Sequence, residues 1–531
     1  MHYYLDSREG DDNADGRSPQ TAWRTLAKAN DHTFAPGDSL LLRRGCSWTG
    51  ETLAPRGSGT PENPILIDAY GEGEQPLIDR QGGFSDTENA TEAVCLTNQS
   101  YWTIRHLTVS NTNPAAPGQV EPPLIDGERF AMFPLRHGLI IRATFREGVR
   151  RTTVRGIVIQ ECRAENIDGT NGDEGNSYHW ELYKGEEDVL GRSGSVCIGA
   201  IVTDNPTGVY RAHMEGLLIE GCTVHNAAGS GIRLDSEAWS YRDSYREVVI
   251  RGNNLCADPA YANSHAGMYI VGAENALVEY NRFCHYANGQ AYQNCHNGTT
   301  RYNFMYDLTG KLSETAKMAG YQTYWDAMGV DVDSHCTGEF HITANIVANM
   351  KDCGFSSFNF ETVSECRIVV EHNIFFNSDF FFNHQNGEHG YTFVFRRNTF
   401  IRDGQNRHGQ YNKIMSFMHK TPHPGTYLHT GNVYFCPGQA MEFDTRSSVY
   451  ADNLYCGERG GVPEEGFLTE DPALRIPVME ELEDCSYDGE IQGTRSFCAT
   501  DWFAPLEGSP CIREGSIVLG ADPAVVRAGR H

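Results

Sequence analysis

Three aspartates, Asp326, Asp331 and Asp333, lie close together in the segment YWDAMGVDVDSH, residues 324–335. Two carboxylates that flank a glycosidic bond can divide hydrolysis between a proton donor and a nucleophile or base. Crowding favours that division, because mutual repulsion raises the pKa of one carboxyl and leaves the other ionised. The segment therefore predicts an acid–base site, provided that the backbone presents these side chains together.

A short strand-like run that ends in asparagine recurs along the chain. Five of the seven separations between successive asparagines lie between 21 and 28 residues, about one turn of a three-sided coil of short strands. This repeat is typical of a parallel β-solenoid, in which each coil buries its apolar face against the next coil. Asparagine suits the bend because it tolerates left-handed backbone geometry and can hydrogen-bond its equivalent one coil away. The asparagines expected to play this structural role are Asn253, Asn281, Asn303, Asn345, Asn373, Asn398, Asn432 and Asn453.

Both ends of the chain carry capping signals, which an open solenoid needs. An amphipathic helix is expected over residues 19–31, with Ser18 as its N-cap and Pro19 at its first position. Residues 507–522 combine turn residues with a short apolar strand. Both ends resemble right-handed parallel β-helix proteins that act on carbohydrates. The expected fold is all-β: a single right-handed parallel β-helix domain over 1–531, with a cap region at 1–50, stacked coils at 51–475, a second cap region at 476–531 and long loop insertions that wall a groove.

Period-2 alternation predicts which strand residues face outward. Val330 and Val332 are expected to face the core, so that Asp331 and Asp333 point outward together. The same alternation in other coils places further polar side chains on this face, about 4.8 Å apart from coil to coil. The face is expected to form an open groove that binds substrate. Its other expected members are Asp235, Tyr269, Asn359, Glu361, Asn383, His384 and His419.

The longest separation between successive asparagines, 42 residues, contains an insertion that leads directly into the aspartate strand. It is expected to bring Tyr321, Tyr324, Trp325 and Asp326 to the edge of the groove. Long irregular loops on a rigid scaffold are usually functional. Aromatic rings beside polar groups suit sugar rings, although core packing is the alternative explanation for Tyr324 and Trp325.

The pattern Asp326-x-x-Gly329-x-x-x-Asp333 resembles the paired aspartates of β-helix glycosidases of the lacto-N-biosidase type. The resemblance implies a retaining glycoside hydrolase that cleaves an oligosaccharide, with Asp326 as acid/base and Asp333 as nucleophile. Asp331 is a further candidate, because residues two apart on a strand have Cα atoms roughly 6.5–7 Å apart and their carboxylates can reach the retaining separation. Other β-helix glycosidases, such as xylosidases and fucosidases, place the second carboxylate elsewhere, which makes Glu361 and Asp235 the alternatives.

Two other functions fit the same fold. A polysaccharide lyase or uronate epimerase would hold Ca²⁺ with Asp331 and Asp333 and take its base from His384, His419, Lys413 or Lys420. Few cations are available to hold an acidic polymer, and the net charge of −27 repels one. In a non-catalytic carbohydrate-binding solenoid, the aspartates would only improve solubility.

The charge and hydropathy of the chain exclude some classes of binding partner. The net charge of −27 argues against nucleic acid and against anionic membranes, and no apolar run approaches the roughly 18 residues of a membrane span. Sixteen scattered cysteines without a C-x-x-C pair favour reduced core thiols over a disulfide framework. No leader precedes the first strand-like segment, so a cytoplasmic location is expected, with a secreted protein trimmed of its leader as the alternative, and a bacterial source is expected. The acidic segment 10–16 lacks the distal glutamate of an EF-hand, so a capping turn is expected there. Neither a cofactor nor a bound metal is expected for the hydrolase, and the oligomeric state stays open.

Overall fold

The computed structural model describes most of residues 1–527. The segments outside the description are 83–89, 116–123, 127–128, 133–134, 170–194, 206, 237–242, 258–265, 287, 309–326, 334, 359–365, 379, 386–390, 404–414, 418–425, 442, 444–447, 459–463, 465–468, 479–480, 483–501 and 515. The chain divides into two compact units, the first over residues 1–274 with 311–323 and the second over 275–310 with 324–531. The single-domain organisation expected from the sequence stays a prediction.

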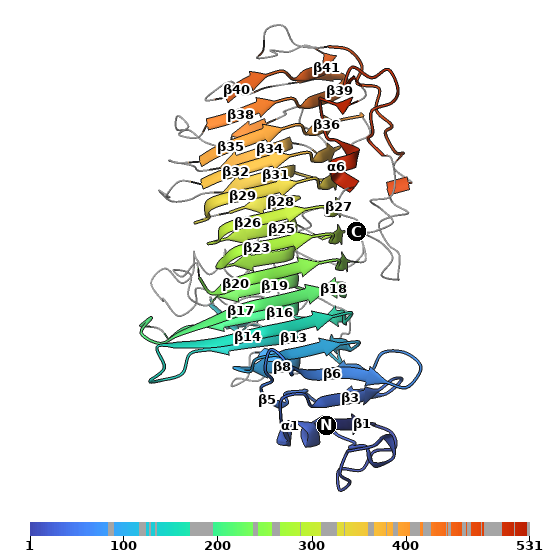
Figure 1. The fold of residues 1–531 in the computed structure, drawn as a ribbon, viewed down its shortest axis with the longest axis vertical. Helices are drawn as coiled ribbons and strands as arrows, with labels where there is room; N and C mark the ends of the chain where they lie inside the picture. Colours follow the sequence, from blue (N-terminus) through green and yellow to red (C-terminus); the bar gives the residue numbers. More distant parts are fainter. Residues whose placement is uncertain are drawn as a thin grey trace. The chain divides into compact units, whose positions relative to one another are not determined.

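The first unit is built from coils whose strands form three parallel sheets, and the first coils at the N-terminus contribute no strand to the third sheet (Figure 1). Its first sheet contains β1 (His2–Leu5), β3 (Ser39–Arg43), β6 (Ile65–Tyr70), β9 (Trp102–Arg105), β14 (Arg151–Gln160), β17 (Arg211–Glu220) and β20 (Tyr245–Arg251). The second contains β4 (Ser47–Thr49), β7 (Leu77–Asp79), β10 (Thr108–Asn111), β15 (Arg163–Ile167), β18 (Thr223–Ala227) and β21 (Asn254–Cys256). The third contains β8 (Ala90–Thr97), β13 (Leu135–Thr144), β16 (Val196–Thr203), β19 (Ser230–Ser236) and β22 (Ala266–Val271).

The second unit repeats this arrangement. Its first sheet contains β23 (Ala273–Glu279), β26 (His296–Arg301), β29 (Thr337–Thr343), β32 (Cys366–Glu371), β35 (Tyr391–Arg396), β38 (Thr426–Thr430) and β40 (Ser448–Ala451). The second contains β24 (Arg282–Cys284), β27 (Phe304–Tyr306), β30 (Ile346–Ala348), β33 (Ile374–Phe376), β36 (Thr399–Ile401), β39 (Val433–Ala440) and β41 (Leu454–Glu458). The third contains β25 (Asn288–Gln293), β28 (Val330–Val332), β31 (Cys353–Phe358), β34 (Phe380–Gln385) and β37 (Met415–Phe417). The fold is the right-handed parallel β-helix that the repeat predicts.

Shorter elements lie outside these three sheets. They are β2 (Thr33–Phe34), β5 (Arg56–Gly57), β11 (Leu124–Asp126), β12 (Arg129–Met132), β42 (Ile512–Arg513), β43 (Ser516–Ile517), the 3-10 turn η1 (Pro19–Thr21), α1 (Leu26–Asp31) and α6 (Pro523–Arg527). No described helix has both the length and the apolarity that crossing a membrane would need.

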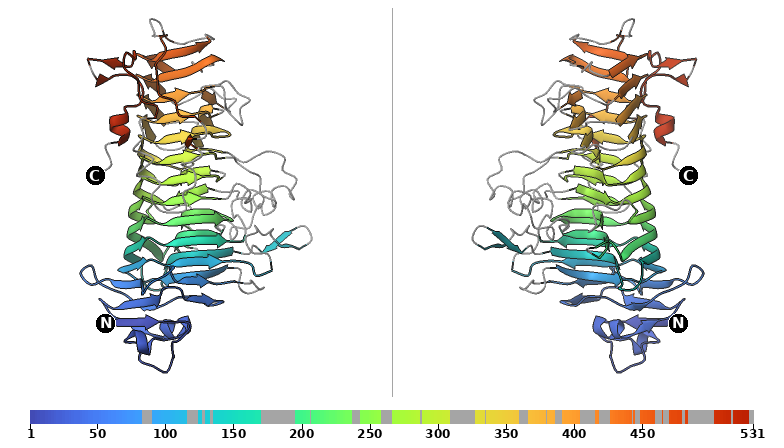
Figure 2. Two further views of the ribbon diagram at one scale, coloured as in Figure 1. Left: turned by 90° about the vertical axis from the view of Figure 1, so that its right-hand side faces the viewer. Right: turned by 90° about the vertical axis from the view of Figure 1, so that its left-hand side faces the viewer.

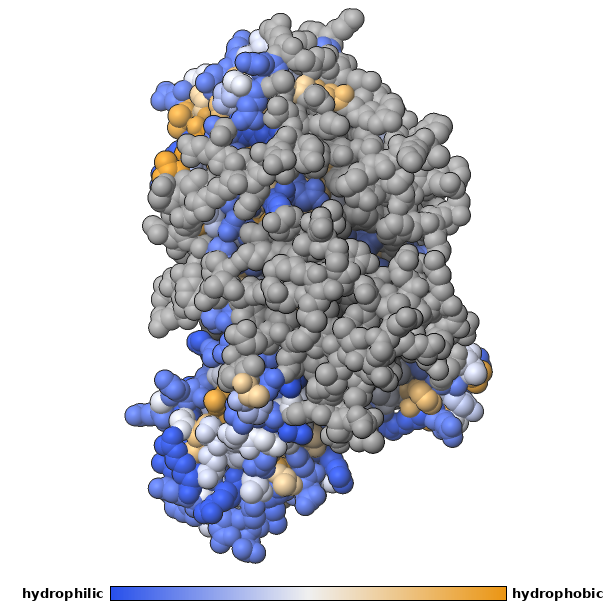
Figure 3. Space-filling view, turned by 180° about the vertical axis from the view of Figure 1, so that it is seen from behind, coloured by the Kyte–Doolittle hydropathy of each residue, from blue (hydrophilic) through white to orange (hydrophobic). Residues whose placement is uncertain are grey.

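The N-terminal cap differs from the single helix expected over 19–31. The segment forms η1, capped by Ser18, and then α1, capped by Thr25. Between them Trp23 is extended, because its N–H donates to the carbonyl of Tyr4 in β1 at 2.8 Å. The acidic loop makes a capping turn as predicted, with Asp12 Oδ1 accepting from the Thr25 N–H at 3.1 Å. Around this cap, the visible described surface of the N-terminal coils is mainly hydrophilic (Figure 3).

A C-terminal segment covers the outward side of the second sheet in the second unit. Trp502, Phe503 and Val526 pack in one buried cluster with residues of β33, including Ile374 and Phe376. Figure 2 shows α6 beside these strands. Both faces of the second sheet are therefore apolar and buried here, which leaves the other sheets to carry any polar site.

The asparagines stack at the bend between the first and second sheets, as predicted. In the second unit, the N–H of Asn373 donates to Asn398 Oδ1 at 3.0 Å, and its Nδ2 donates to the same oxygen at 3.1 Å. Nδ2 also donates to the carbonyl of Ile342 at 2.7 Å. Contacts of this kind run from Asn281 to Asn453, and every member is at most 2% exposed. The structural role of these asparagines is confirmed.

Other residue types complete the two ends of this stack. In the first unit, the Cys222 N–H donates to Asn253 Oδ1 at 2.9 Å, and the Cys222 thiol lies 3.5 Å from the carbonyl of Glu220 and 3.8 Å from that of Ile159, either of which can accept its proton. Burial raises the pKa of this thiol, which keeps its proton available as a donor. In the second unit, Glu464 accepts from Asn453 Nδ2 at 3.0 Å and ends the series. Donors and acceptors are therefore satisfied where the asparagine pattern stops.

Two cysteines depart from the expected reduced state. Twelve described cysteines are free thiols, whereas Cys256 and Cys284 are disulfide-bonded. The expectation of reduced thiols is wrong for these two.

Acid should destabilise the protein through buried histidines. His429 is stacked between the rings of Phe395 and Tyr450, with centroid distances of 4.7 and 4.5 Å, and burial lowers its pKa to about 3. The unfolded chain takes up this proton near a pKa of 6.5, so the stability contributed by neutral His429 is lost as the pH falls below that value. We expect a loss of about 2 kcal/mol from this residue between pH 7 and pH 5.

The measurement is urea unfolding of the wild type and of His429→Phe at both pH values. The variant should lose about 2 kcal/mol less than the wild type on acidification. Equal losses in the two proteins would contradict this role of His429.

Candidate active site

The aspartate strand β28 has the predicted orientation. Val330 and Val332 are fully buried. Val332 pairs with Tyr292 of β25, and Val330 pairs with Phe355 of β31. Both aromatic rings pack against core aromatic rings of the first sheet. The valines therefore face the interior, and Asp331 between them points outward.

Gly329 and Gly354, at the bend where the chain passes from the second to the third sheet, determine which residues of the following strands face inward. A Cβ on Gly329 would lie 2.5 Å from Cγ1 of Val347, and a Cβ on Gly354 would lie 2.4 Å from Cδ1 of Phe375. Both neighbours are buried residues of the second sheet. Because only glycine fits this inside corner, the strand turns at a fixed residue and Asp331 cannot shift to the inward side.

Asp331 is buried, which differs from the open groove predicted at this position. Its exposed fraction is 4%, and that of Ser356 is 0%. Ser356 is its register partner on β31 and donates from Oγ to Asp331 Oδ1 at 2.7 Å. A carboxylate can be buried on an outward face when a neighbouring coil supplies hydrogen bonds. Sequence alternation gives the direction of the side chain but not this partner.

Asp333 lies just beyond the end of β28 and is only partly buried. Its N–H donates to the carbonyl of Tyr292 at 2.8 Å, which continues the pairing with β25 past Val332. The strand alternation therefore extends to Asp333, on the same side as Asp331. The next described residue, His335, has a φ of +63°, so the chain turns away there.

Many of the predicted site residues cannot be placed. Asp326, Tyr321, Tyr324, Trp325, Asn359, Glu361 and His419 lie outside the described residues, as do Lys413 and Lys420. Asn383 and His384 belong to β34, where their backbones pair with Ser356 and Ser357, but their side chains are not described. The grouping of Asp326 with Asp333 therefore stays a prediction.

In the first unit, Asp235 and Tyr269 lie on β19 and β22. Arg233 connects them: its guanidinium lies 4.6 Å from the centre of the Tyr269 ring, and its Nε lies 3.3 Å from Asp235 Oδ2. Asp235 Oδ1 accepts from the Ser236 N–H at 2.9 Å, and Asp235 is 1% exposed. A buried carboxylate with both oxygens engaged is poorly suited to donate a proton to substrate. These contacts weigh against Asp235 as the alternative second carboxylate.

A charged cluster that the sequence did not predict lies on the third sheet of the first unit and consists of Glu92, Arg142 and His137. Glu92 forms an ion pair with Arg142. Burial alone would raise the pKa of Glu92, but the Arg142 guanidinium brings it below its ordinary value. Burial lowers the pKa of His137, the register partner of Glu92, to about 4, and its Nδ1 accepts from the Val196 N–H at 3.1 Å. The cluster was missed because its members lie in different coils with no sequence motif.

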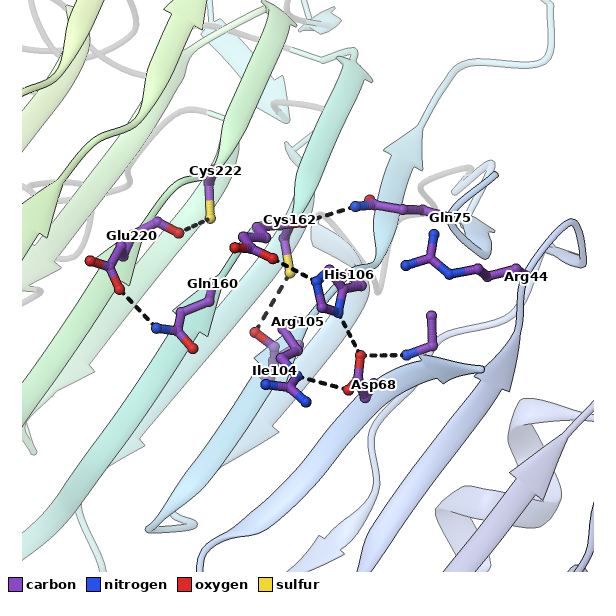
Figure 4. Close-up of polar contacts among 12 residues, drawn as sticks. Arg44, Asp68, Gln75, Ile104, Arg105, His106, Gln160, Cys162, Glu220 and Cys222 are labelled. Atoms are coloured by element: carbon purple, nitrogen blue, oxygen red, sulfur yellow. Dashed lines mark hydrogen bonds and ion pairs between the residues drawn. The ribbon is translucent and has the colours of Figure 1, made fainter. Parts of the chain in front are cut away.

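A second histidine cluster lies at the end of the first sheet of the first unit (Figure 4). His106 bridges two other coils, with Nδ1 at 2.7 Å from Asp68 Oδ1 and Nε2 at 2.5 Å from Glu161 Oε2. Arg105 donates to the other oxygen of Asp68 at 2.7 Å. These hydrogen bonds join Asp68, His106 and Glu161, which come from three successive coils. We therefore assign the cluster a structural role in holding these coils together. Across the described part of the chain, no group of three or more His, Cys, Asp or Glu side chains could hold a metal ion.

Comparisons with known proteins agree with the resemblance carried by the aspartate motif. No family profile matches this chain. A lacto-N-biosidase of Bifidobacterium longum subsp. longum is 36% identical over 85 residues, which are 15% of this chain and 5% of that protein. The match thus spans about one twentieth of the relative's length.

Solved structures give a similar result at low identity. A GH136 lacto-N-biosidase from Eubacterium ramulus has a TM-score of 0.49 and 18% identity, over 78% of this chain and 67% of that chain. A mannuronic acid specific polysaccharide family 6 lyase from human gut microbiota has a TM-score of 0.43 and 10% identity, over 94% and 96%. These values are too low to support a conclusion about activity. The chain is similar to β-helix enzymes that act on carbohydrates, and one segment is similar to a lacto-N-biosidase.

Proposed function

We propose that this chain is a glycoside hydrolase that cleaves an oligosaccharide with two carboxylates and without a cofactor. Asp333 carries the proposal: of the two described aspartates of the segment it is the partly buried one, and its N–H pairs with the Tyr292 carbonyl, which continues the strand alternation. In this mechanism Asp333 is the nucleophile and Asp326 is the acid/base, as the motif implies. The first step forms a glycosyl ester on Asp333 while Asp326 protonates the leaving oxygen. Water then hydrolyses the ester, and the product retains its anomeric configuration.

Asp331 has a different role in this proposal. Its carboxylate is buried and accepts a hydrogen bond from Ser356, so it is less accessible to a sugar than the partly buried Asp333. In the proposed arrangement of Asp326 and Asp333, a fixed negative charge on Asp331 would oppose ionisation of a neighbouring carboxyl and so favour a proton on the acid. The three aspartates thus combine a nucleophile, a proton donor and a fixed anion.

The proposal is tested with a panel of aryl glycosides and of gut and plant oligosaccharides, including a lacto-N-bioside because the similar protein is named a lacto-N-biosidase. The product anomer is read by NMR before mutarotation. We expect cleavage of at least one substrate, with retention and with the same rate in EDTA. Activity that EDTA removes and Ca²⁺ restores, with an unsaturated product that absorbs in the ultraviolet, would instead identify a lyase. Binding without turnover would favour a carbohydrate-binding solenoid.

A further inference from the structure

The Ser356 hydroxyl has two neighbours, Asp331 and Met328, and donates its proton to Asp331. Its Oγ lies 2.7 Å from Asp331 Oδ1 and 2.6 Å from the sulfur of Met328. A hydroxyl donates one hydrogen bond, and a carboxylate is a much stronger acceptor than a thioether. The proton therefore points to Asp331, and Met328 fills the other side of the hydroxyl by packing.

The surroundings leave the carboxylate little freedom. On β25 the register partner of Asp331 is Ala291, which is 4% exposed and has no polar side-chain atom. On β31 the partner is Ser356, with no exposed surface. The glycine corner at Gly329 fixes the backbone two residues earlier. Of the two register partners of Asp331, Ser356 thus donates a hydrogen bond to the carboxylate, and the Ala291 side chain has no group that could do so.

We propose that Ser356 is a positioning residue that keeps the Asp331 carboxylate ionised and fixed beside Asp333. This inference rests on the proposed glycosidase function for its kinetic consequence, but not for the contact itself. A hydrogen bond donated to a carboxylate stabilises the charged form. When Ser356 is removed, Asp331 binds a proton at higher pH, and the fixed anion is lost earlier during acidification.

The kinetic test compares pH–rate profiles of kcat/KM for the wild type, Ser356→Ala and Ser356→Thr. Ser356→Ala should move the acid limb to lower pH, because Asp331 then takes up its proton before Asp333 and no longer opposes ionisation of the nucleophile, and Ser356→Thr, which keeps the hydroxyl, should restore most of the shift. Ser357→Ala is the matched control, because Ser357 is equally buried and donates to the backbone carbonyl of Val332 at 2.9 Å. It should destabilise the protein without moving the profile.

A double-mutant comparison separates positioning from general damage. In an Asp331→Asn background, Ser356→Ala should cause no further shift of the acid limb, because the group that it acts on is no longer ionisable. A shift of equal size in both backgrounds, or an unchanged profile in an active Ser356→Ala protein, would overturn the inference.

Urea unfolding of the same variants provides a readout that needs no activity. The destabilisation by Ser356→Ala should be larger at pH 7 than at pH 4, because protonation of Asp331 removes the charge-assisted bond. The effect of Ser357→Ala should not depend on pH. If no substrate is cleaved, the proposed function fails, while this measurement still decides the role of Ser356: a destabilisation that is the same at both pH values refutes it.

Discussion

Asp333→Asn is expected to lower the rate of glycoside cleavage by roughly a thousandfold or more while the protein stays folded. The amide has the same size as the carboxylate and preserves the backbone bond from residue 333 to Tyr292, but it cannot form the glycosyl ester. The loss should be as large for aryl glycosides as for oligosaccharides, because the nucleophile is needed with either leaving group. Initial rates and circular dichroism measure the two quantities.

Asp326→Asn distinguishes the acid from the nucleophile. An activated aryl leaving group needs little protonation, so this variant should lose much less rate on such a substrate than on an oligosaccharide. Asp452→Asn is the matched control, since Asp452 is exposed and lies at the bend between β40 and β41 of the second unit. It should keep the wild-type rate. Near-normal rates for both Asp326→Asn and Asp333→Asn would refute the assignment.

Asn373→Ala is expected to destabilise the protein by roughly 3–5 kcal/mol. Asn373 Oδ1 accepts from both the N–H and Nδ2 of Asn345 at 2.9 Å, and its own Nδ2 donates to the carbonyl of Ile342 at 2.7 Å. The side chain is fully buried, so water cannot replace these bonds. The substitution leaves the buried N–H of Asn345 without its acceptor and removes one hydrogen bond from the Ile342 carbonyl, whereas Asn345 Nδ2 keeps its bond to the Thr300 carbonyl. Urea unfolding measures the cost.

Asn275→Gly provides the control for this prediction. Asn275 lies within β23, also with a left-handed φ (+59°), and accepts from Asn297 Nδ2 one coil away at 2.9 Å, but it is exposed. Glycine accepts the same φ and water can satisfy the lost bond, so the expected change is below about 1 kcal/mol. If the two substitutions cost the same, burial is not what makes the asparagine stack stabilising.

The repeat and the direction of the site strand could be read from the sequence. Each coil must bury its own apolar face, so the period of about one coil is written along the chain as recurring β-branched runs that end in asparagine. The same local rule, alternation on a strand, correctly places Val330 and Val332 inside and Asp331 outside. These features depend on neighbours along the chain, which is why sequence alone reaches them.

The tertiary structure decided which of these outward groups have partners. Asp331 is buried because Ser356 of the next coil donates to it, and Asp235 is engaged by Arg233 and by the Ser236 N–H. Cys222 and Glu464 complete the asparagine stack without sharing its motif. These contacts cross between coils or depend on rotamers. The spacing of residues along the chain does not predict these contacts, because the loops between the coils vary in length while the register between neighbouring strands stays fixed.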